Sequence, residues 1–135
     1  MQRERMTIVR YRWHDGMWHP IMEFGIAASD NVVRVTAYVD TGAYVSIFRP
    51  RVAQALGMDI ERGRLIHVRS VNGTLIPVWL HHVTILIGRW RIPAMVGFCE
   101  RLGVGFNLLG RKDVFQMLAF TFNDRQRKLT ITDAA

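Results

Sequence analysis

The chain has 135 residues, the size of one domain, and a chain of this length buries enough surface to fold without disulfides or a metal. Its formal net charge is +7, half of its residues are apolar and 21% are charged, a composition typical of a soluble globular protein. No apolar run reaches the roughly 20 residues that a membrane-spanning helix needs, so the sequence predicts no transmembrane segment.

The N-terminus and the single cysteine together indicate a reducing compartment. Residues 1–12 alternate charged and apolar side chains and contain no signal-peptide core. Cys99 has no second cysteine with which to form an internal disulfide. We therefore expect a cytoplasmic protein.

The basic charge comes almost entirely from arginine, since sixteen of the eighteen basic residues are arginines. They are scattered from Arg3 to Arg127 and form no continuous patch in the sequence. A solvated, arginine-rich surface is the preferred interpretation, and a nucleic-acid partner is not expected. A basic β-barrel that binds nucleic acid remains an alternative.

Short apolar runs separated by turn residues predict an all-β protein. The runs, most of them expected strands, cover residues 7–13, 21–27, 32–39, 44–48, 65–71, 74–80, 82–87, 90–96, 106–109, 118–122 and 128–132. Turn signals stand at residues 14–16, 29–31, 72–73 and 88. Two short helices are expected, one beginning at Pro50 and ending at Gly57 and one over residues 111–117. This pattern predicts a closed, barrel-like β fold in a single domain.

The tetrapeptide Asp40-Thr41-Gly42-Ala43 is the clearest candidate for chemistry. It lies between two apolar runs, so Asp40 is expected at a tight turn directly after a buried strand. A catalytic carboxylate must be rigidly held and partly desolvated, and such a turn provides both. Gly42 permits a sharp bend, and the Thr41 hydroxyl can tie the loop to neighbouring backbone. An ordinary aspartate turn between strands is the alternative.

Two later segments extend this motif. Val71-Asn72-Gly73-Thr74 is the expected tip of a hairpin, because Asn-Gly between apolar runs favours a tight turn. The segment from Asn107 through Leu108, Leu109 and Gly110 is an apolar-apolar-glycine sequence before the second expected helix. In this order the three motifs resemble the retroviral-type, or retropepsin-like, aspartic proteases over roughly residues 21–132.

The resemblance implies a fold, a set of site residues and an assembly. It implies a closed retropepsin-like acid-protease barrel, active as a homodimer, over residues 21–133, with residues 1–20 as an N-terminal extension that could form a strand or a dimer or partner contact. The implied site residues are catalytic Asp40, the active-site loop residues Thr41, Gly42 and Ala43, the flap residues Val71, Asn72, Gly73 and Thr74, and the loop-supporting residues Leu108, Leu109 and Gly110. No metal or other cofactor is implied.

The implied function is that of an aspartic endopeptidase. The family mechanism needs two close carboxylates, and this chain has one D-T-G motif and is too short for two lobes. A symmetric homodimer that sets Asp40 against Asp40′ of a second copy satisfies the requirement. A peptide or protein is then the substrate. A protease-like domain that lacks activity and binds peptide or dimerises partners is the alternative.

The sequence departs from the viral pattern at three points. Viral enzymes carry an acidic residue directly after D-T-G-A, which pairs with an arginine after the apolar-apolar-glycine motif; here Tyr44 occupies that position and Arg111 lacks this partner. Ser46 is more typical of cellular and bacterial relatives. The expected flap tip has one glycine, Gly73, where viral flaps have several.

The other reactive side chains carry no recognisable motif. The five histidines lack the spacing of metal ligands, so structural or surface roles are expected for them. Cys99 lies in no cysteine-protease signature and is expected to be a buried or half-buried thiol.

Overall fold

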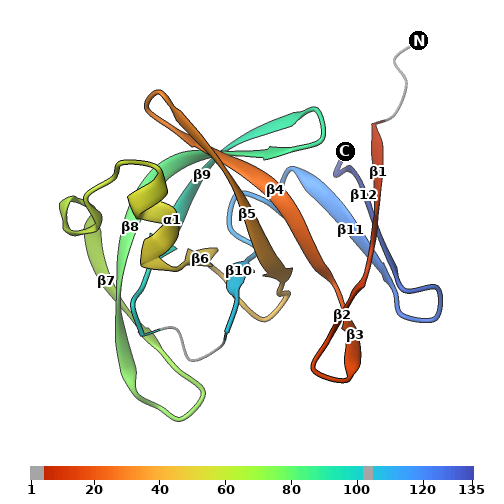
Figure 1. Ribbon diagram of the computed structural model, residues 1–135, viewed down its shortest axis with the longest axis horizontal. Coiled ribbons are helices and arrows are strands. Elements are labelled where there is room, and N and C mark those ends of the chain that lie inside the picture. Colours follow the sequence, from red (N-terminus) through yellow and green to blue (C-terminus); the bar gives the residue numbers. More distant parts are fainter. Residues whose placement is uncertain (1–4, 102–104) are drawn as a thin grey trace.

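A computed structural model of the chain describes residues 5–101 and 105–135 and consists almost entirely of strands (Figure 1). The strands are β1 (Met6–Arg10), β2 (Arg12–His14), β3 (Met17–His19), β4 (Ile21–Ala28), β5 (Asn31–Val39), β6 (Ile47–Phe48), β7 (Arg64–Arg69), β8 (Leu75–Ile87), β9 (Trp90–Phe98), β10 (Asn107–Leu109), β11 (Leu118–Asn123) and β12 (Lys128–Asp133). One α-helix, α1 (Pro50–Ala55), and one short 3₁₀ helix, η1 (Ile60–Arg62), complete the described elements. The predicted all-β class is confirmed.

A seven-stranded sheet closes on itself to form the barrel. Its strand order is β4-β5-β10-β6-β9-β8-β7, and an additional pairing between the edge strand β4 and β8, the strand before the other edge, closes it. The long strand β8 makes this possible, because its first half pairs with β7 and its second half pairs with β4. The predicted closed barrel is thus confirmed, and its closure leaves few strand edges exposed.

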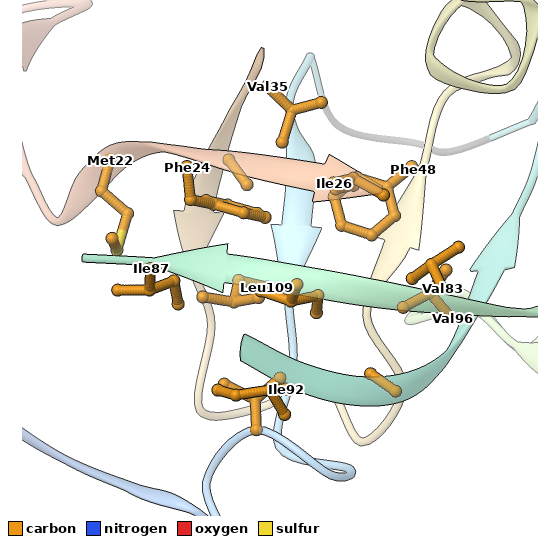
Figure 2. Close-up of a cluster of buried hydrophobic side chains, with 14 of the residues drawn as sticks. Met22, Phe24, Ile26, Val35, Phe48, Val83, Ile87, Ile92, Val96 and Leu109 are labelled. Carbon is orange, nitrogen blue, oxygen red and sulfur yellow. The ribbon is translucent and has the colours of Figure 1, made fainter. Parts of the chain in front are cut away.

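The barrel interior is filled by apolar side chains from both its antiparallel and its parallel strands (Figure 2). On β4, Met22, Phe24 and Ile26 alternate with more exposed residues, so one face of the strand lies in the core. Leu109 of β10 is fully buried in the same cluster. Removing a buried side chain of this size costs about 2–5 kcal/mol, so the core holds β10 firmly beside β5.

A second, three-stranded sheet has the order β1-β12-β11 and joins the two ends of the described chain. The indole N–H of Trp90, at the start of β9, donates to Asp133 Oδ1 at 2.8 Å and connects this sheet to the barrel. That hydrogen bond is the main cause of a lowered pKa at Asp133. Residues 6–10, inside the predicted N-terminal extension, are thus paired with a strand near the C-terminus; the domain boundary at residue 20 stays a prediction.

The structure differs from the expected strands in two places. The expected strand over residues 7–13 is interrupted at Tyr11, whose N–H donates to Arg127 O and whose hydroxyl donates to Asp124 Oδ1 at 2.8 Å. These contacts turn the chain out of β1 and into the separate hairpin β2–β3. The runs at residues 74–80 and 82–87 are one continuous strand, β8, because His81 pairs with Val96 in the β9 ladder without a break.

One of the two expected helices is present. Helix α1 begins at Pro50 and is followed by Gly57 at a φ of 69°, in agreement with the expected start and stop signals. The prediction of a helix over residues 111–117 is wrong, because this segment forms successive turns. Asp113 has a φ of 67°, outside the helical region, and its carboxylate accepts from the N–H of Met95 on β9. In the described residues no helix is long and apolar enough to cross a membrane.

Candidate active site

Asp40 directly follows β5, at the point where the parallel strand β10 lies alongside. Leu109 is the register partner of Val39, and the Asp40 N–H donates to Leu109 O at 3.0 Å. On the other side, the Val39 N–H donates to Pro20 O at 2.9 Å. The Asp40 residue itself is half-buried. A ladder of backbone hydrogen bonds therefore fixes the position at which the carboxylate emerges from the barrel.

The D-T-G-A segment folds into a tight turn around the Asp40 carboxylate. The Gly42 N–H donates to Asp40 Oδ1 at 2.8 Å, and the Ala43 N–H donates to Asp40 O at 3.2 Å. A Cβ atom at Gly42 would lie 3.2 Å from Asp40 Oδ1, closer than most Cβ contacts. Thr41 is exposed, and within the described ranges its hydroxyl has no hydrogen-bond partner in the chain. The turn thus holds the carboxylate in one orientation.

The apolar-apolar-glycine segment lies against the back of this turn. The Arg111 N–H donates to Ala43 O at 3.0 Å, and the Gly110 N–H donates to the buried Ser46 Oγ at 2.9 Å. A Cβ atom at Gly110 would lie 2.8 Å from Ala43 O and from Val45 O, so only glycine fits between these backbone atoms. The structure therefore brings Leu108, Leu109 and Gly110 to the Asp40 turn from 68 to 70 residues further along the chain.

Replacing Ser46 with alanine should destabilise the protein through this contact. The residue is 1% exposed, so the change leaves the buried Gly110 N–H without an acceptor. The expected loss is about 1–3 kcal/mol in the free energy of unfolding, measured by urea denaturation. Ser29→Ala, at an exposed serine, is the matched control; an equal loss in both variants would contradict a supporting role for Ser46.

Tyr44 occupies the position at which the viral pattern has an acid, and it lies close to two cations. The Arg111 guanidinium lies 5.6 Å from the centre of the Tyr44 ring, and Lys112 Nζ lies 6.0 Å from it. The Lys112 N–H also donates to Tyr44 O. Arg111 thus has an aromatic neighbour where the viral pattern has a carboxylate. Apart from the aromatic residue at position 44, no sequence pattern indicated this pair.

The second candidate segment is the tip of the hairpin β7–β8. Gly73 has a φ of 86°, and its N–H donates to Ser70 O at 2.9 Å, while the Thr74 N–H and the Ser70 hydroxyl donate to Asn72 Oδ1. Val71, Asn72, Gly73 and Thr74 are all exposed. Figure 1 shows this hairpin and the β5–β6 connection, which begins with Asp40, projecting on the same side of the barrel.

An aromatic cluster that the sequence did not indicate flanks the end of β5. It consists of His14, His19, Tyr38 and Phe106. His19 Nδ1 lies 3.1 Å from the Tyr38 hydroxyl, and the rings of His14 and Phe106 lie 4.6 Å apart. Burial, and then the charges of Asp40 and Asp124, raise the pKa of Tyr38, so its hydroxyl stays protonated at neutral pH. The cluster joins the hairpin β2–β3 to the strand that carries Asp40.

Other reactive groups lie apart from this turn. Cys99 is 2% exposed, and burial raises the pKa of its thiol, which disfavours the reactive thiolate. Among the residues that the structure describes, no group of three His, Cys, Asp or Glu side chains could hold a metal ion.

Comparisons with known proteins agree on one family and one fold. A model of the aspartyl protease family matches residues 26–110, more than half of the chain. A retropepsin-like aspartic protease from Rickettsia conorii has a similar structure, with a TM-score of 0.66 and 17% sequence identity over 98% of this chain and 97% of that one. The EIAV protease, solved in complex with the inhibitor HBY-793, has a TM-score of 0.55 and 19% identity over 74% of this chain and 88% of that one. No curated protein sequence matches the chain significantly.

Proposed function

Because the chain belongs to the aspartyl protease family and has a retropepsin-like fold, we propose that it is an endopeptidase in which Asp40 and Asp40′ of a second copy form one catalytic dyad. The observation that carries this proposal is the Asp40 turn itself. Its carboxylate is held by the Gly42 N–H, and its backbone is held by β10. A carboxylate fixed in this way at the rim of a packed barrel is prepared for proton transfer.

The proposed mechanism uses one proton shared by two carboxylates. Like charges about 3 Å apart cannot both persist, so the pair keeps one proton, a property for which aspartic proteases are the reference case. The ionised carboxylate takes a proton from a water molecule, whose oxygen attacks the peptide carbonyl carbon. The protonated carboxylate donates its proton to the carbonyl oxygen and so stabilises the developing negative charge. Collapse of the tetrahedral intermediate, with proton transfer to the nitrogen, breaks the C–N bond.

A second copy is needed because one chain supplies one such turn. In the described part of the chain, the Asp40 carboxylate has a single hydrogen bond, from Gly42, and no ion pair. A two-fold axis beside Asp40 would bring the identical turn into contact with it. The two hairpin tips containing Val71 to Thr74 would then cover the substrate from both chains and exclude water. We expect the substrates to be peptides in an extended conformation. A cytoplasmic location also remains our expectation.

Cleavage of a mixed peptide library tests the proposal. We expect the purified protein to cut internal peptide bonds, with the new termini identified by mass spectrometry. The rate of cleavage should decrease as the pH becomes alkaline, because the dyad loses its shared proton there. A folded dimer that binds peptides without cutting any of them would instead favour an inactive binding domain. Activity that rises steadily beyond neutral pH would contradict the dyad.

A further inference from the structure

The hairpin β2–β3 presents large apolar side chains to solvent on both of its faces. Trp13 is 61% exposed, Met17 is 62% exposed and Trp18 is 40% exposed, all within six residues. The two tryptophan rings pack edge to face at 5.3 Å, and the Arg127 guanidinium lies 4.7 Å from the Trp18 ring. Met17 is the register partner of His14 and therefore lies on the opposite face of the hairpin from the two tryptophans. Isolated exposed apolar residues are common, but a packed pair of exposed tryptophans indicates a contact surface.

The hairpin is held next to the Asp40 strand. His14 packs against Phe106 and His19 against Tyr38, so this face of the hairpin is anchored to the barrel. Pro20, directly after the hairpin, accepts the hydrogen bond from the N–H of Val39. The hairpin therefore has a defined position relative to Asp40.

The direction in which the hairpin projects decides what it meets. In Figure 1 the hairpin β2–β3 extends on the same side of the barrel as the β5–β6 connection and the end of the hairpin β7–β8. A second copy that brings Asp40′ to Asp40 approaches this same side. We propose that the β2–β3 hairpin, through Trp13, Met17 and Trp18, forms part of the contact with the second copy. The inference rests on the proposed dyad.

The surface area that a stable dimer buries supports a second copy as the partner of this hairpin. Stable interfaces bury about 800 Å² on each partner, more than two four-residue turns around Asp40 can supply. Tryptophan and methionine are enriched at such interfaces, and tryptophans frequently dominate the binding energy. The hairpin adds these residue types on the side of the barrel where the Asp40 turn lies (Figure 1).

Sedimentation of a hairpin variant tests the inference. In Trp13→Ser/Met17→Ser the dimer dissociation constant should rise by at least about tenfold, as for loss of an interface hot spot. Val32→Ser is the matched control, since Val32 is 66% exposed near the opposite end of β5; its dissociation constant should change by less than about twofold. Met17→Glu, a single change at an exposed site, should also weaken the dimer. The thermal midpoint of each protein shows whether the double variant is folded, and Met17→Glu provides a second test if it is not.

Repeating the measurement in the Asp40→Asn background separates this inference from the proposed activity. A weaker dimer in both hairpin variants supports the inference, with or without peptide cleavage by the wild type. Dissociation constants equal to that of Val32→Ser overturn it while leaving a cleaving wild-type enzyme unaffected. A wild-type protein that stays monomeric at every concentration overturns both the hairpin contact and the dyad.

Discussion

Asp40→Asn should lose peptide cleavage by more than about 10³-fold in kcat/KM, because the amide can neither accept the proton of the attacking water nor carry the shared proton. The fold should persist, since asparagine has the same shape and its Oδ1 can still accept from the Gly42 N–H. The measurement is kcat/KM on a peptide selected from the library, together with the unfolding midpoint of each protein.

Asp59→Asn is the matched control for this substitution. Asp59 Oδ1 accepts from the Glu61 N–H at 3.2 Å, so this residue also orders a turn through a hydrogen bond two residues along the chain. Its substitution makes the same chemical change at the same kind of contact, away from the proposed site. We expect Asp59→Asn to keep wild-type activity. Full activity in Asp40→Asn would remove Asp40 from the mechanism.

Local signals in the sequence predicted the elements that local chemistry determines. Helix α1 begins at Pro50 and ends just before Gly57, and Gly73 takes the positive φ that the Asn-Gly turn required. The Asp40 turn also lies directly after a buried strand, as the flanking apolar runs indicated. In the first two cases a residue with restricted or unusual backbone freedom marks the position, and in the third the alternation of apolar runs does.

Contacts between distant segments explain what the sequence did not predict. The break at Tyr11 depends on Arg127 and Asp124, more than 110 residues away, and no pattern around residues 7–13 reveals it. Likewise, Asp113 leaves the helical region in a segment that accepts a hydrogen bond from Met95. Tertiary contacts outweigh helix propensity over so short a segment.

The candidate site shows the same division. The motif around Asp40 could be recognised from adjacent residues, whereas the Ser46–Gly110 hydrogen bond joins residues 64 positions apart. The aromatic cluster that holds the β2–β3 hairpin also combines residues from three parts of the chain. Sequence periodicity carries no information on such pairings, so the roles of these residues emerge from the fold.

An excess of the inert variant should inhibit the wild-type protein. If one site needs Asp40 from both chains, each mixed dimer of wild type and Asp40→Asn lacks half of the dyad. With ninefold more Asp40→Asn than wild type, random exchange leaves about one-tenth of the wild-type chains in intact dimers. Activity per wild-type chain should then fall roughly tenfold, although nothing has been removed from the active protein.

Titration of wild-type protein with Asp40→Asn, at constant wild-type concentration and with saturating peptide, therefore tests the shared site most directly. An unrelated protein added at the same concentrations is the control for non-specific effects. The dyad predicts that activity per wild-type chain falls in proportion to the wild-type fraction of the mixture. Activity that stays constant through the titration, while sedimentation shows that the chains have exchanged, would contradict it and would mean that each chain works alone.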